Sequence, residues 1–131
     1  MNVMFRDDFI LRQIDMMIQV IAKLIFSKDN IDYEIEDEND LSSTDYIFIK
    51  VKELLAKNDF CTAEDILMDA VRENSIHADK MFLNLALWFY DQLNKKTDDQ
   101  LEENNFSRDE ITEGLNKVSK LYNIDLSSVL Y

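Results

Sequence analysis

The chain has 131 residues and a formal net charge of −13, which excludes a conventional nucleic-acid binder because such a protein needs cations to neutralise phosphates. There is no proline and only one glycine, Gly114, whereas an all-β protein needs turn residues at frequent intervals. The composition therefore predicts an all-α domain that is large enough to bury a core.

From Asp8 to Phe26 the sequence reads DFILRQIDMMIQVIAKLIF and predicts a long N-terminal amphipathic helix. Its apolar residues recur at spacings of four and three, the rhythm of a helix that presents a seam to another helix. We expect this seam to be a self-association face, formed by Ile10, Ile14, Met17, Ile21 and Leu24. Packing of the same seam within its own chain is an equally good interpretation of the pattern.

An acidic stretch follows the first helix. Residues 29–45 contain eight acidic residues and no basic one, so we expect a solvated linker that extends from the body. A calcium-binding EF-hand loop is excluded, because it requires glycine at its sixth position, where a loop starting at Asp32 has Asp37. The predicted organisation is an amphipathic helix at 1–28, an acidic linker at 29–44 and a helical domain at 45–131, together one structural unit.

The next two helices are predicted to form an antiparallel hairpin. Ser42 with Asp45 makes a capping box for a helix that ends near Lys57, and Thr62 is the expected start of the following helix. The sequence NDFCTA at 58–63, followed by Leu67 and Ala70, resembles the second half of a tetratricopeptide unit.

That resemblance covers roughly 30 residues, and no second copy follows at the interval of about 34 residues that this repeat has. Asn58 also replaces the usual glycine, and Ser75 stands near the usual proline. We therefore expect a repeat-like hairpin inside a compact antiparallel bundle, with a groove suited to a peptide or protein partner.

The C-terminal half completes the predicted bundle. Residues 78–93 are hydrophobic on nearly all sides, which places this helix in the middle of the bundle. Thr97 with Gln100 caps a short helix, and Ser107 with Glu110 caps the last long helix. Gly114 inside that helix indicates a close helix contact, and residues 125–131 are expected to add a final turn.

No pattern of catalytic residues is present. His77 is the only histidine and is expected at the surface, while Cys61 is expected to be a small buried residue. The motifs HExxH, GxSxG and CxxC do not occur. We therefore expect no enzyme activity, no cofactor and no metal site.

Several stretches resemble a family of small, uncharacterised helical proteins from Gram-positive gut bacteria, a domain of unknown function. The stretches are Met4-Phe5, residues 8–12 with Ile14, residues 87–93, residues 106–111 and Gly114-Leu115. The resemblance covers most of the chain and implies a helical, repeat-like protein, but it supplies no catalytic residue.

The sequence favours a non-catalytic interaction or scaffold protein that forms a homo-oligomer, with a dimer expected, through its first helix. The alternative is an acidic nucleic-acid mimic that inhibits a basic protein, because residues 29–45 and 97–113 hold 15 of the 27 acidic residues. Asp7 and Asp8 oppose a signal peptide, and together with Asp15 they oppose a membrane contact. With a single cysteine, the reducing cytoplasm is the expected location.

Overall fold

The computed structural model describes residues 2–77 and 79–127. They form helices and contain no strand, which confirms the predicted all-α class. In chain order the elements are α1 (Asn2–Ile21), the π-helical turn η1 (Ala22–Phe26), α2 (Ser43–Ala56), α3 (Phe60–Ser75), α4 (Lys80–Asn94), α5 (Asp98–Glu103) and α6 (Arg108–Leu121).

The starts of three helices follow from capping boxes. In each box the side chains and backbone amides of the cap and of the third helical residue bond reciprocally. All three predicted boxes are present, at Ser42 with Asp45, Thr97 with Gln100, and Ser107 with Glu110. The predicted start of α3 at Thr62 is wrong: the Asp59 side chain accepts the Thr62 amide, so α3 begins at Phe60.

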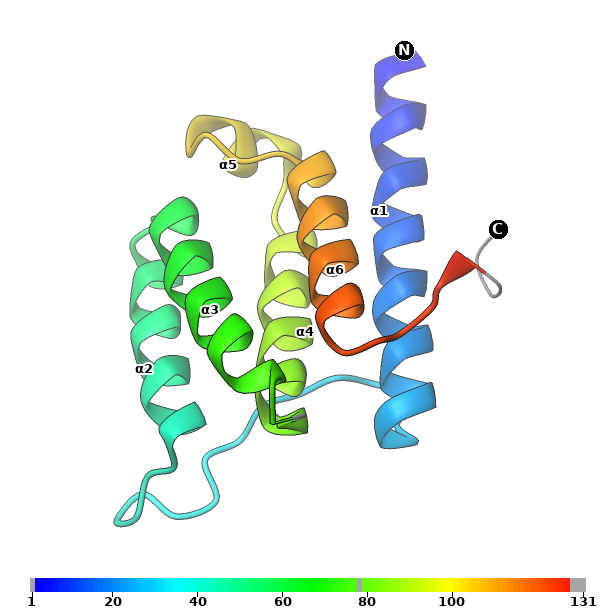
Figure 1. Cartoon of the computed structure of the whole chain (residues 1–131). Coiled ribbons are helices and arrows are strands. Elements are labelled where there is room, and N and C mark those ends of the chain that lie inside the picture. The colour runs from blue at the N-terminus through cyan, green and yellow to red at the C-terminus, as the bar shows by residue number, and fades with distance from the viewer. Residues whose placement is uncertain (1, 78, 128–131) are drawn as a thin grey trace.

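Helix α4 lies in the middle of the bundle and packs against α1, α2, α3 and α6 (Figure 1). It runs antiparallel to α1, α3 and α6, while α2 and α3 form the expected antiparallel hairpin. Every residue from Phe82 to Tyr90 is buried, because neighbouring helices cover α4 on all sides. The structure thus confirms the compact helical bundle and the central position of this helix.

The acidic connection between η1 and α2 is fastened to the body rather than extended from it. Tyr33 is 5% exposed and stacks on Phe48 with ring centroids 4.4 Å apart. Its hydroxyl donates to Asp45 at 2.6 Å, and the Asn84 side-chain amide donates to the Asp32 carbonyl at 3.1 Å. The expectation of a linker that extends from the body is therefore wrong, because an aromatic residue within the acidic stretch can bury itself while the carboxylates of residues 29–40 remain exposed.

Helix α6 packs along α1 and α4 through Ile111, Leu115 and Val118, none of which has exposed surface. After α6 the chain crosses towards α1 (Figure 1). Leu126, within this last described segment, is buried. The expected final turn at 125–131 lies partly outside the described residues.

Candidate functional site

The predicted self-association seam of α1 faces the interior of its own chain. Ile14, Met17 and Ile21 have no exposed surface, and Ile10 is half-buried against the same core. Leu24 is the exception, with 59% of its surface exposed. Most of the seam is therefore covered by α4 and α6, as in the alternative interpretation of the pattern. We call Ile10, Ile14, Met17 and Ile21 the inner face.

A side-chain hydrogen bond also holds α1 against the bundle. The side-chain amide of Asn94, at the end of α4, donates to the Leu11 carbonyl at 3.0 Å. The buried guanidinium of Arg108 donates to both the carbonyl and the side-chain oxygen of Asn94 at 3.0 Å. Arg108 also donates to the Lys96 carbonyl at 2.7 Å, so it fixes the C-terminal end of α4 where α1 passes.

A second side of α1, continued by η1, carries exposed apolar side chains together with Val20, which is partly buried against the core. We call it the outer stripe, formed by Phe9, Gln13, Met16, Val20 and Leu24. Phe9, Met16 and Leu24 are 68%, 54% and 59% exposed, while Gln13 and Val20 are half-buried. The spacings of four, three, four and four place all five on one side of a helix.

The π-helical turn η1 contributes to this alignment. A π-helix has more residues per turn than an α-helix, so successive residues in η1 advance through a smaller angle. Leu24 therefore stays nearer to the line of Met16 and Val20 than it would in an unbroken α-helix. Sequence reasoning missed the outer stripe for two reasons. Phe9 and Met16 stand seven residues apart, and the more regular spacing of the seam residues overlaps them in the sequence.

The charge near the outer stripe differs from that of the rest of the chain. Residues 1–28 contain four Lys or Arg and three Asp, a net charge of +1. Because the whole chain carries −13, the remaining residues carry −14. Beside the stripe, Arg12 pairs with Asp8 at 3.1 Å and Lys23 pairs with Asp29 at 3.2 Å. The first helix is therefore a nearly neutral surface on a strongly acidic protein.

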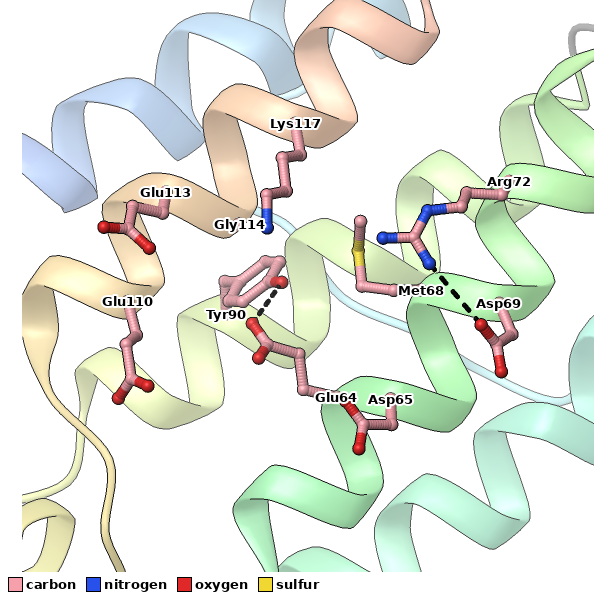
Figure 2. A pocket seen from close by; sticks show the side chains of 10 residues that line it. All are labelled: Glu64, Asp65, Met68, Asp69, Arg72, Tyr90, Glu110, Glu113, Gly114 and Lys117. Carbon is pink, nitrogen blue, oxygen red and sulfur yellow. Dashed lines mark hydrogen bonds and ion pairs between the residues drawn. The ribbon is translucent and has the colours of Figure 1, made fainter.

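A polar cavity of about 420 Å³ lies between α3, α4 and α6. Five carboxylates and two cations line it, with Tyr90 between the two walls (Figure 2). The Tyr90 hydroxyl donates to the Glu64 carboxylate at 2.7 Å and so joins α4 to α3. Arg72, on the α3 side of the cavity, pairs with Asp69 at 3.5 Å.

Gly114 explains how Tyr90 reaches Glu64. A Cβ atom at position 114 would overlap the Tyr90 hydroxyl and ring, so only glycine lets the phenol pass under α6. This confirms the close helix contact that Gly114 predicts. Sequence reasoning missed the Tyr90–Glu64 pair itself, since no local pattern links two residues that lie 26 positions apart.

The electrostatics of the pair favour a structural hydrogen bond. Burial raises the pKa of the Glu64 carboxyl; the Tyr90 hydrogen bond opposes that shift, and the Glu110 carboxylate adds to it. Burial, together with the Glu64 charge, also raises the pKa of the Tyr90 phenol. Tyr90 therefore remains a protonated donor at neutral pH and does not serve as a base.

The two single-copy residues with catalytic potential lie apart from one another. His77 and Cys61 are both exposed, so the expected burial of Cys61 is wrong. Partial burial raises the pKa of the Cys61 thiol, and the Glu110 and Glu64 carboxylates add to this shift. A raised pKa disfavours the thiolate, which is the nucleophilic form.

Neither a metal site nor a membrane span occurs in the part of the chain that the structure describes. Among the described side chains, those of 8–77 and 79–127, no group of three or more His, Cys, Asp or Glu has an arrangement that could hold a metal ion. In that same part of the chain, none of the helices combines the length and apolarity needed to cross a bilayer.

Residues 4–123 match DUF6483, which is described as a family of unknown function. The chain belongs to this family. The matched region runs from α1 to just past the end of α6, so it includes the inner face, the outer stripe and the cavity. Comparisons with curated proteins and with solved structures gave no match.

Proposed function

We propose that this protein is a non-catalytic interaction or scaffold protein that forms a homodimer through the outer stripe of α1. The observation that carries the proposal is the clustering of exposed apolar side chains. Of the six large hydrophobic residues that are exposed among the described residues, Phe9, Met16 and Leu24 lie along this one stripe. Large apolar groups gathered on one surface mark an interaction site, whereas single ones scattered over a surface need no explanation.

In a homodimer, the charge distribution favours α1 as the segment through which the two copies meet. Two acidic proteins repel one another wherever their negative surfaces approach. Residues 1–28 carry a net charge of +1 while the remainder carries −14, so α1 is the segment through which two copies can meet at the lowest electrostatic cost. Homodimers with two-fold symmetry are also the commonest soluble oligomers.

The test is the solution mass of the full chain by light scattering, for the wild type and for Met16→Asp. We expect a wild-type dimer and a folded Met16→Asp monomer, because the new carboxylate would be buried without a partner in the interface. Met81→Asp is the matched control, since Met81 is a methionine of similar exposure, 47%, at the start of α4. A monomeric wild type, or equal loss of the dimer in both variants, would contradict the proposal.

The same proposal holds that the protein is not an enzyme and that it acts in the cytoplasm of a Gram-positive gut bacterium. The exposed, unpaired thiol of Cys61 supports a reducing compartment. The buried small residues Ala63 and Ala70, beside buried Phe60 and Leu67, support a tetratricopeptide-like α2–α3 hairpin. A dimer would present two such hairpins to a peptide or protein partner.

Acidic mimicry of a nucleic acid is the second candidate. The exposed carboxylates of α5, from Asp98, Asp99, Glu102 and Glu103, favour it. It ranks second because α5 and the acidic connection lie at opposite ends of the bundle and form no continuous row of charges (Figure 1). The test is whether the chain displaces DNA from a basic protein. Displacement that is lost when the four α5 carboxylates become amides would support mimicry. Salt-independent binding to that protein would exclude it.

A further inference from the structure

We infer that residues 29–41 of the acidic connection form a strap that opens as a unit while the helices stay folded. In the closed position that the structure shows, the Tyr33 ring lies on Phe48 of α2, and the strap crosses α4 at Asn84. Opening withdraws Tyr33 and exposes the aromatic side chains beneath it. Low ionic strength favours the open position.

Tyr33 is the latch of the strap. Among residues 29–41 it is the one buried side chain, whereas the seven carboxylates are all exposed and Ile31, Ile35 and Leu41 are half-buried. In the part of the chain that the structure describes, no backbone hydrogen bond joins residues 29–41 to a helix. A segment with so few buried apolar groups and no backbone bonds to its surroundings opens locally at a lower free energy than the core.

The contact of the strap with α4 is imperfect. The side-chain amide nitrogen of Asn84 donates to the Asp32 carbonyl, but the side-chain oxygen of Asn84 is buried and has no hydrogen-bond partner among the described residues. A buried acceptor without a partner carries a desolvation cost that offsets the bond beside it. Because both atoms belong to one amide group, opening of the strap lets water reach the oxygen and removes this cost.

The helices beneath the strap have attachments of their own. The capping box of Ser42 with Asp45 fixes the start of α2 without Tyr33. The rings of Phe48 and Trp88 meet edge to face at 4.9 Å and join α2 to α4. Trp88 lies one turn after Asn84 on the same face of α4, so the strap passes close to it. Opening therefore exposes the Phe48 and Trp88 rings and leaves their mutual contact in place.

The charges make the closed strap sensitive to salt. The strap carries seven carboxylates and no cation. The charged groups beside it are four carboxylates and three ammonium groups, those of Asp15, Asp45, Asp79, Asp91, Lys23, Lys52 and Lys95. Repulsion among like charges therefore opposes closure. Salt weakens this repulsion, because the screening length falls from about 30 Å at 0.01 M to about 8 Å at 0.15 M ionic strength.

Trp88 is the only tryptophan of the chain and so reports on the strap directly. Tyr33→Ala should raise the acrylamide quenching constant of Trp88 by at least about 2-fold and leave the helical circular dichroism signal intact. Tyr46→Ala is the matched control, since Tyr46 is 62% exposed in the first turn of α2, and it should leave the quenching unchanged. Unchanged quenching in a folded Tyr33→Ala protein would overturn the inference. Loss of the helical signal would do so too, because the connection would then belong to the cooperative core.

Urea denaturation of the wild type tests the strap without removing its latch. In about 20 mM NaCl, Trp88 fluorescence should begin to change at a lower urea concentration than the circular dichroism of the helices, because the strap opens first. In about 500 mM NaCl the gap between the two transitions should narrow. Repeating the measurement with the Met16→Asp chain separates strap opening from dissociation of a dimer. Coincident transitions at low salt in either protein would show that the connection unfolds only with the bundle, and the inference would be wrong.

Discussion

Helix α1 has two apolar faces with different surroundings. On the inner face, Ile14, Met17 and Ile21 have no exposed surface, whereas on the outer stripe Phe9 and Met16 are more than half exposed. Both faces have the three-and-four spacing of a helix that packs on another helix. The spacing of apolar residues therefore identifies a face that packs, whereas the neighbouring elements decide which chain covers that face.

The largest expected effect comes from breaking the inner face. Replacing Ile14 and Met17 together by Asp would place two unpaired charges in a core site, which costs several kcal/mol for each charge. That sum reaches the whole stability of a typical domain, about 5–15 kcal/mol. We therefore expect loss of the helical circular dichroism signal at 25 °C.

The corresponding double change on the outer stripe is the control. Phe9 and Met16 are both more than half exposed, so Phe9→Asp with Met16→Asp should leave a folded, soluble helical chain. If the inner-face variant stayed folded and became monomeric, the seam would lie between chains and the arrangement of α1 described above would be wrong.

Two adjacent methionines allow the inner face and the outer stripe to be compared at single residues. Met17 has no exposed surface and Met16 is 54% exposed, although they differ by one position. Met17→Ala should lower the free energy of unfolding by about 2–5 kcal/mol, as buried methionine truncations do. Met16→Ala should change the stability of the monomer by less than about 0.5 kcal/mol. Urea denaturation of both variants, at a protein concentration below the dimer Kd, measures the difference.

The bundle that covers the inner face also depends on a close approach of α4 and α6 at Gly114. Gly114→Ala would push α6 away from Tyr90, and overpacking of this kind costs about 1–3 kcal/mol. Helix propensity alone predicts the opposite sign, a gain of about 1 kcal/mol. Thermal unfolding of Gly114→Ala beside Asn116→Ala, at an exposed site of the same helix, separates the two effects.

A double-variant cycle identifies the atom responsible. Tyr90→Phe removes the hydroxyl that lies nearest to a Cβ at position 114. Gly114→Ala should therefore cost less in the Tyr90→Phe protein than in the wild type, although the phenylalanine variant also loses the hydrogen bond to Glu64. Equal costs in both proteins would show that the close contact is not with the hydroxyl.

The features predicted correctly from the sequence are local or follow from composition. A capping box such as Ser107 with Glu110 is fixed within four residues, so its sequence pattern is enough to place the start of α6. The central place of α4 follows from its apolar residues on every side, since such a helix can be covered only by surrounding elements.

The features that the sequence did not predict depend on contacts between distant residues. Tyr33 bonds Asp45 across 12 positions, and Arg108 bonds Asn94 across 14, so neither the fastened connection nor the fixed end of α4 has a local signal. The spacing of the seam residues predicts a packing face on α1, but its cover by α4 and α6 depends on the tertiary arrangement. Leu24 illustrates the same point, because it shares the rhythm of the seam yet lies on the outer side of η1.

The smallest expected effect concerns the attachment that keeps the inner face on its own chain. Asp45 accepts hydrogen bonds from the Tyr33 hydroxyl and the Ser42 amide, and these bonds lower the pKa of its carboxyl, the Tyr33 bond most strongly. The stabilisation is therefore complete above the unfolded pKa of about 3.9 and is lost as the pH falls through the lower folded value.

Asp45→Asn should then cost about 1 kcal/mol at pH 7, the usual worth of a helix cap, and the difference from the wild type should shrink as the pH falls below about 4. Urea denaturation of both proteins across this range measures it, with Asp40→Asn as the control at an exposed position of the same connection. A cost that stays constant with pH would mean that the charge of Asp45 does not hold the connection. In that case α1 would be fixed by the packing of its inner face and by the Asn94 bond alone.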